Sequence, residues 1–93
     1  MPPEQAAGAG ARIEGALSFS QVPRWLAQAD SLAAAGSVDL AAITRADSAG
    51  LALLLELTRR AKARGQSLQL RNPPAQLIEL THFFGLEALL RFS

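Results

Sequence analysis

Residues 44–57 read TRADSAGLALLLEL, a polar opening followed by the start of an apolar helix. Asp47 stands at the N-cap position, where its carboxylate would accept hydrogen bonds from the first helical turn and stabilise the helix by roughly 1 kcal/mol. Gly50 is less favourable than alanine in a helix by about 0.5–1 kcal/mol, which indicates that another segment approaches the backbone there. Ser48 is then either an ordinary first-turn residue or a residue on which a partner or a modifying enzyme acts.

The residues after Ser48 divide between two faces when they are placed at about 100° per residue. One face is expected to pack on a sheet and holds Leu51, Leu54, Leu55, Thr58 and Ala61. The other is expected to meet solvent and holds Ala49, Ala52, Leu53, Glu56 and Arg60, with Leu57 near the border. An exposed Leu53 is either one of the single surface leucines common in proteins or the anchor of a shallow docking patch beside small alanines. Glu56 and Arg60 are expected to pair at i,i+4 spacing.

Strand and helix patterns alternate along the chain. The expected elements are strand 11–19, helix 21–35, strand 37–43, helix 48–64, strand 67–72, helix 74–84 and a short edge strand at 88–92. Gly15 is expected to form a bulge in the first strand, Ser20 to cap the first helix and Gly36 to end it. Gly85 followed by an apolar residue, Leu86, predicts a Schellman ending for the last helix.

This β-α-β-α-β-α order predicts an α/β fold in which a small, mostly parallel β-sheet is covered by α-helices. Residues 1–11 are rich in Pro, Ala and Gly and are expected to be a flexible or weakly structured lead-in. Residues 12–93 are expected to form one domain, because 93 residues are too few for two cores.

The composition narrows the classes of function. The formal charge of +1 and the scattered arginines argue against nucleic acid as a partner. The absence of cysteine excludes disulfides and thiolate metal sites. The N-terminus lacks the pattern of a secretory signal, and LALLL at 51–55 is far too short to span a bilayer. We therefore expect a soluble cytoplasmic protein that reaches a membrane only through a partner.

No feature of the sequence predicts catalysis, a metal or a cofactor. The chain has a single histidine, His82, with no nucleophile expected beside it. A P-loop, a dinucleotide-binding glycine pattern and a cluster of metal ligands are all missing from the sequence. The acids Glu56, Glu79 and Asp39 are each isolated and are expected to be solvated or capping charges. We therefore expect a protein that is not an enzyme.

The stretch DSAGL, after an apolar strand and at the start of a helix, resembles the motif of STAS domains, the fold of anti-sigma factor antagonists. From residue 37 onward the sequence resembles the MlaB family, the cytoplasmic STAS subunits of the Mla phospholipid ABC transporter. The similar features are the D-S-x-G-L-A-L-L-L helix start, the basic end of that helix and the strand–Pro–helix–Gly-Leu tail. STAS domains usually begin with an additional strand, and the corresponding segment here, Gln5–Ala11, is Gly/Ala-rich and weak.

The resemblance implies a non-catalytic subunit that binds a MlaF-like ATPase, and through it the membrane permease complex. Such a subunit supports transporter assembly and activity in maintaining outer-membrane lipid asymmetry, and it lies peripheral to the inner membrane without inserting into it. The residues it implies for partner binding are Asp47, Ser48, Ala49, Gly50, Ala52, Leu53 and Glu56. The alternative is an anti-sigma factor antagonist that is regulated by phosphorylation of Ser48, since the family's phosphorylated serine stands at this position.

Overall fold

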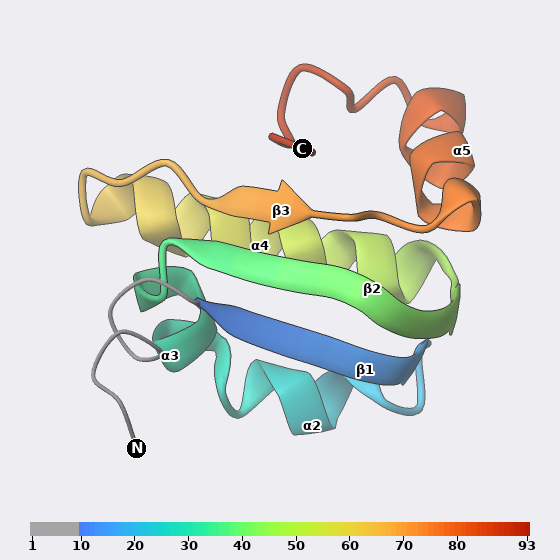
Figure 1. Cartoon of the computed structure of the whole chain (residues 1–93), viewed down its shortest axis with the longest axis horizontal. Coiled ribbons are helices and arrows are strands. Elements are labelled where there is room, and N and C mark those ends of the chain that lie inside the picture. The colour runs from blue at the N-terminus through green and yellow to red at the C-terminus, as the bar shows by residue number, and fades with distance from the viewer. Residues whose placement is uncertain (1–9) are drawn as a thin grey trace.

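A computed structural model describes residues 10–93 of the chain. Its strands form one parallel sheet in the order β1-β2-β3, with β2 in the centre. The elements are β1 (Ala11–Leu17), α2 (Val22–Leu26), α3 (Ala29–Ala34), β2 (Ser37–Ala46), α4 (Ser48–Ala63), β3 (Gln69–Arg71) and α5 (Ala75–Phe83) (Figure 1). The predicted α/β fold with a parallel sheet is confirmed.

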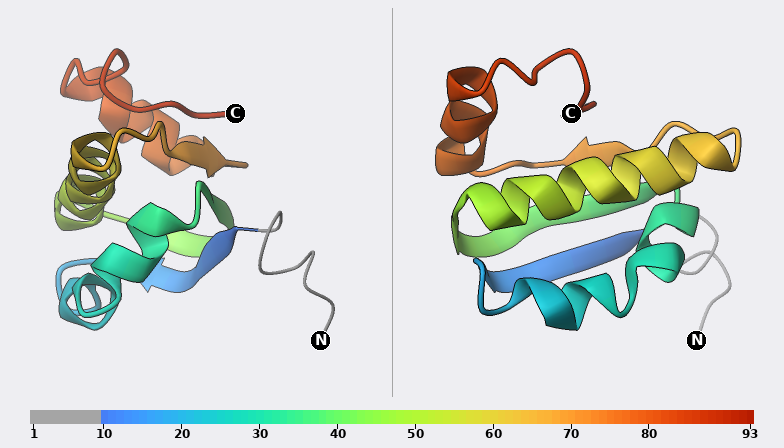
Figure 2. Two further views of the ribbon diagram at one scale, coloured as in Figure 1. Left: turned by 90° about the vertical axis from the view of Figure 1, so that its left-hand side faces the viewer. Right: turned by 180° about the vertical axis from the view of Figure 1, so that it is seen from behind.

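The helices α2, α3 and α4 lie on the same face of the sheet (Figure 2). The central strand shows why, because its side chains alternate between the two faces. Val38 and Leu40 are fully buried beneath the helices, whereas the intervening Asp39 is half-buried and Ala41 is exposed. The other face of the sheet is therefore more open to solvent, and the core is built between the sheet and one helical layer.

The core fills the space between this face and the helices. Helix α4 is its largest helical contributor, and Leu54, Leu57 and Ala61 are fully buried. They join one apolar cluster with Leu17 of β1 and Val38 of β2. Packing of this buried face against the sheet contributes more to the stability of α4 than its intrinsic helix propensity does.

Strand β1 contains the predicted irregularity. Its register with β2 shifts between Arg12 and Glu14 and again between Gly15 and Ala16. Gly15 has a φ of 82°, a left-handed conformation that favours glycine. The bulge prediction at Gly15 is confirmed, although the strand ends at Leu17 instead of continuing to residue 19.

The prediction of one continuous helix over residues 21–35 is wrong. The segment forms two short helices, α2 and α3, separated at Ala27 and Gln28, where Gln28 has φ −108° and ψ 13°. Alanine and glutamine are good helix formers, so local propensity does not mark this break and tertiary packing decides it. Ser20 does not cap α2, since the N-cap residue is Gln21 and its side chain makes no capping bond.

The C-terminal predictions are better. The amide of Gly85 donates to the carbonyl of His82 at 3.0 Å and that of Leu86 donates to Thr81 at 2.9 Å, which is the predicted Schellman motif. The expected edge strand at 88–92 is reduced to a single parallel bridge between Leu70 and Phe92. Residues 1–9 of the predicted lead-in, and with them most of the weak segment Gln5–Ala11, lie outside the described residues. Ala11, which is described, belongs to β1 and not to the lead-in.

Candidate functional site

Asp47 starts helix α4, as predicted. Its Oδ1 accepts hydrogen bonds from the amides of Ala49 at 3.0 Å and Gly50 at 3.1 Å, while its Oδ2 accepts one from the amide of Phe19 at 3.0 Å. These bonds, the one from Phe19 most of all, hold the pKa of the Asp47 carboxyl below its ordinary value. Asp47 thus joins the loop after β1 to the first turn of α4.

Gly50 allows α4 to approach β1 closely. A Cβ atom at this position would lie 2.2 Å from the carbonyl oxygen of Leu17, which real contacts do not permit. The close backbone approach inferred from the sequence is therefore confirmed. Gly50 is itself buried at this contact, so it positions α4, and its predicted role in partner binding stays a prediction.

Leu53 is also buried, which corrects the predicted solvent-facing side of α4. Its exposed fraction is 2%, and the neighbouring Leu57 is fully buried. Leu55, expected in the core, is only half-buried. The angular pattern separated the faces of α4 but could not place α2, which packs on the side that was assigned to solvent. The buried face is consequently rotated toward Leu53 and Leu57.

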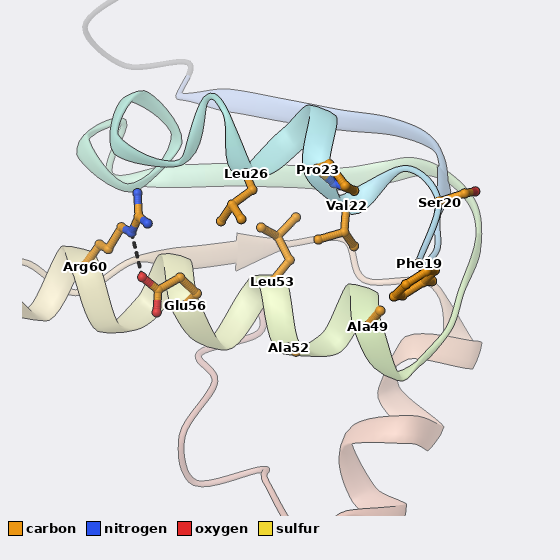
Figure 3. A pocket seen from close by; sticks show the side chains of 10 residues that line it. All are labelled: Phe19, Ser20, Val22, Pro23, Leu26, Ala49, Ala52, Leu53, Glu56 and Arg60. Atoms are coloured by element: carbon orange, nitrogen blue, oxygen red, sulfur yellow. Dashed lines mark hydrogen bonds and ion pairs between the residues drawn. The ribbon is translucent and has the colours of Figure 1, made fainter.

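The two helices enclose a groove of about 580 Å³ beside Leu53. We call this the α2–α4 groove; it is lined by Phe19, Ser20, Val22, Pro23, Leu26, Ala49, Ala52, Leu53, Glu56 and Arg60 (Figure 3). Its walls are mostly apolar, and small alanines form part of the α4 side. Phe19 and Leu26 on the opposite wall remain 79% and 43% exposed. Exposed large apolar side chains around a concave surface are typical of a binding site.

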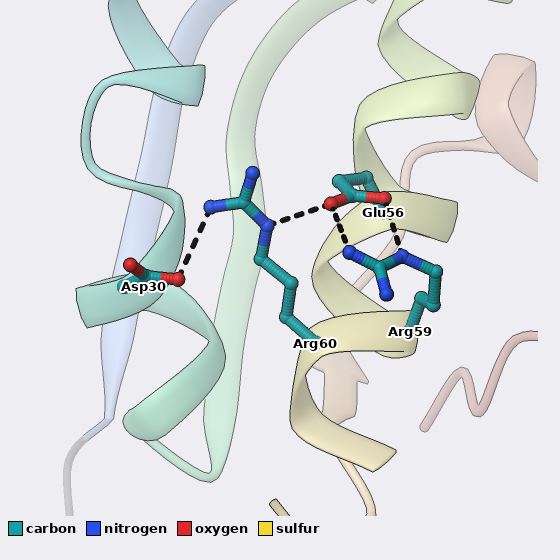
Figure 4. A network of polar contacts seen from close by, with 4 residues as sticks. All are labelled: Asp30, Glu56, Arg59 and Arg60. Atoms are coloured by element: carbon teal, nitrogen blue, oxygen red, sulfur yellow. Dashed lines mark hydrogen bonds and ion pairs between the residues drawn. The ribbon is translucent and has the colours of Figure 1, made fainter. Parts of the chain in front are cut away.

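A chain of ion pairs (Figure 4) lies at one end of the groove, where Glu56 and Arg60 line it (Figure 3). Glu56 accepts hydrogen bonds from Arg59 at 2.8 Å and from Arg60 at 2.7 Å, which confirms the predicted pair with Arg60. Arg60 also reaches Asp30 on α3 at 3.1 Å. The hydrogen bonds from Arg59 and Arg60 lower the pKa of Glu56 to about 2. Glu56 is therefore ionised, and its charge is compensated within the domain.

Four of the residues predicted to bind a partner meet at this groove: Ala49, Ala52, Leu53 and Glu56. Asp47 and Gly50 do not line the groove but fix the start of α4 against the loop after β1 and against Leu17. Ser48 is exposed at the first position of α4. The α2 wall was missed in the sequence. Phe19 was expected as the last residue of the first strand, and nothing in the sequence placed it beside Ala49.

The single histidine of the chain lies apart from the groove. His82 lies on α5, and its ring pairs with Glu87 in the exposed turn that follows. Within residues 10–93, no three His, Cys, Asp or Glu side chains gather as metal ligands. Each helix of that same range falls short of the length and hydrophobicity needed to span a membrane.

Comparison with known proteins agrees with this geometry. The family model described as "Mlab, STAS domain" matches residues 4–91. The solved structure of the anti-sigma factor antagonist SpoIIAA in its unphosphorylated form is similar with a TM-score of 0.68. That likeness covers 90% of this chain and 80% of the other at 21% identity, so it shows the shared fold. A search of curated proteins finds no significant match. On the family match, which covers nearly the whole chain, this protein belongs to the MlaB-like STAS domain family.

Proposed function

We propose that the protein is a non-catalytic accessory subunit that binds the ATPase of an Mla-type phospholipid ABC transporter. Family membership supports this choice over the anti-sigma alternative, because the matching model is described by the Mla subunit. The likeness to SpoIIAA carries the fold alone. In this proposal the subunit supports transporter assembly and activity, and thereby outer-membrane lipid asymmetry, and it is held at the inner membrane by its partner.

The observation that carries the proposal is the α2–α4 groove. Phe19 and Leu26 expose apolar surface to water, and contact of this surface with water does not stabilise an isolated domain. Covering one large apolar side chain is worth about 1.5–3 kcal/mol, so a partner that covers both would gain a useful part of its binding energy. The small side chains of Ala49 and Ala52 let such a partner approach the α4 backbone.

The predicted contact set is accordingly revised. Ala52 and Ser48 are exposed and offer direct contacts, while Ala49 and Glu56 are half-buried at the groove. Leu53 forms the floor of the groove instead of a protruding anchor. The protruding apolar groups come from Phe19 and Leu26 on the opposite wall, so the contact surface uses the loop after β1 and α2 as well as α4.

Replacing Ala52 with arginine tests the proposal. Ala52→Arg places a long charged side chain in the groove without disturbing a buried residue, so the domain should fold and its affinity for an Mla-type ATPase from the same host should fall by at least about tenfold. The matched control is Ala63→Arg, at an exposed position in the last turn of α4 that does not line the groove. Purified pairs would be compared by titration calorimetry. Wild-type affinity in Ala52→Arg would contradict the assigned surface, and no binding by the wild-type protein would contradict the function.

A further inference from the structure

A second hollowed surface lies on a different side of α4, facing the C-terminal segment. Two adjoining hollows, of about 430 and 220 Å³, both use Thr58 and Lys62 from α4 with Ala88 and Leu89 from that segment. Leu89 is 56% exposed, and Leu55 lines the larger hollow. None of these residues lines the α2–α4 groove. We call this the α4–C-terminal surface.

Two of the three cations on this surface have no ion-pair partner among residues 10–93. Lys62 lines both hollows, Arg59 lines the larger and Arg91 the smaller. Arg59 is paired with Glu56, but Lys62 and Arg91 form no ion pair with any residue in 10–93. Among the described residues, no acidic side chain lines either hollow. The charged end of the α2–α4 groove differs, since Glu56 and Arg60 neutralise each other there.

The shape and the charge together define the occupant. A hollow lined by Leu55, Ala88 and Leu89 accepts apolar side chains, and the flanking Lys62 and Arg91 attract carboxylates. The α4 part of the surface, from Leu55 to Lys62, is about 10 Å long at 1.5 Å per residue, so about two helical turns of a partner would cover it. We propose that this surface binds an acidic amphipathic segment of another protein, with apolar residues seated around Leu89 and carboxylates facing Lys62 and Arg91.

This inference does not rest on the proposed function, because the two surfaces share no lining residue. A bilayer is the competing partner for a surface that is basic and apolar. The concave form favours a protein segment, since side chains can enter a hollow that a planar headgroup layer would only cover. Binding to a bilayer is therefore the competing outcome that the experiment must measure.

The probe is a capped synthetic peptide of about 14 residues with leucines on one helical face and glutamates elsewhere. Its control has lysine in place of every glutamate. Amide shift mapping should place the acidic peptide at 55–62 and 86–91, with the dissociation constant rising several-fold between about 50 and 300 mM salt. The lysine peptide should not bind.

Charge reversal identifies the residues responsible. The double variant Lys62→Glu and Arg91→Glu should bind the acidic peptide at least about tenfold more weakly than the wild type. The far-ultraviolet circular dichroism spectrum of the variant should match that of the wild type, which shows that the variant is folded. Arg45→Glu is the matched control, because Arg45 is an exposed cation on β2 that lines none of these hollows. Unchanged affinity in the double variant, or shifts confined to the α2–α4 groove, would overturn the proposal. Binding to vesicles containing about one-third phosphatidylglycerol without binding to the peptide would also overturn it, in favour of a membrane.

Discussion

The amide of Phe19 donates a hydrogen bond of 3.0 Å to Oδ2 of Asp47, although 28 positions separate the two residues in sequence. The other oxygen of the same carboxylate caps α4. One side chain therefore holds both the start of α4 and the loop that carries Phe19, the aromatic residue that lines the α2–α4 groove. This double use makes Asp47 a positioning residue for the groove, in addition to its role in stability.

Asp47→Ala should destabilise the fold by about 1–2 kcal/mol at neutral pH, since helix α4 loses its cap. The pKa of Asp47 is lower in the folded chain, so its contribution is present above the ordinary carboxyl value and is lost as the pH falls through the lowered one. Urea unfolding at pH 7 and near pH 3 measures this, and the variant should lose less stability on acidification than the wild type. Equal losses would show that Asp47 does not carry the pH dependence assigned to it.

Gly50→Ala should destabilise the domain by about 1–3 kcal/mol, the cost of forcing extra volume into a packed contact. The reason is the 2.2 Å approach of the added Cβ to the Leu17 carbonyl. Glycine to alanine within a helix ordinarily stabilises by up to about 1 kcal/mol, so the sign of the change is diagnostic. Thermal unfolding measures it, and a higher melting temperature for the variant would show that α4 and β1 are not in contact there.

Leu53→Asp should unfold the domain or destabilise it by several kcal/mol, because Leu53 is 2% exposed and a carboxylate there would lack a partner. The face predicted from periodicity would have made this substitution harmless to folding. Leu55→Asp is the comparison, with a smaller effect expected at a half-buried position. Chemical denaturation of the two variants ranks them, and greater damage from Leu55→Asp would restore the face predicted from the sequence.

Glu56→Gln should flatten the dependence of stability on acid pH. The pKa of Glu56 is lowered to about 2, so the ionised form stabilises the folded chain above the ordinary glutamate value. That contribution is lost progressively as the pH falls from about 4.5 toward 2. Denaturant midpoints measured across this window should fall more steeply for the wild type than for Glu56→Gln. Parallel curves would mean that the ion pairs with Arg59 and Arg60 do not persist in solution.

Ser48→Glu should fold, because an anionic side chain is favourable at a helix N-terminus and Ser48 is exposed. It should bind the ATPase more weakly if Ser48 lies at the contact, and Ser48→Ala should bind nearly as the wild type does. Intact mass measurement of protein from its own host tests the anti-sigma alternative. A phosphate on Ser48 that controls binding of an anti-sigma factor would favour that alternative over the transporter.

The sequence predicted most of the fold because its signals are local. Asp47 at the N-cap, Gly15 at a bulge and Gly85–Leu86 at a helix end each report a backbone requirement of that position. The division of the first helix into α2 and α3 was not predictable in this way, because neither Ala27 nor Gln28 is a residue type that breaks helices. Packing of both halves onto α4 and the sheet outweighs their helix propensity.

The sequence predicted the α4 side of the candidate site but not the side formed by α2 and the loop before it. One wall of the groove, Ala49, Ala52 and Glu56, follows from the periodicity of α4. The other wall depends on where α2 packs, which is a tertiary relationship that a single helix pattern does not contain. The misplacement of Leu53 has the same origin: the pattern gives the angle between residues on α4 but not the direction in which its neighbours lie.

The bridge from Arg60 to Asp30 gives the α2–α4 groove a direction. It connects α4 to α3 across one end, while Phe19 and Ala49 stand at the other (Figure 3). At the Arg60 end the charges of Asp30, Arg60 and Glu56 already pair with one another, whereas the other end presents the apolar side chain of Phe19. We therefore expect an occupant of the groove to be apolar near Phe19 and to need no charge of its own near Arg60.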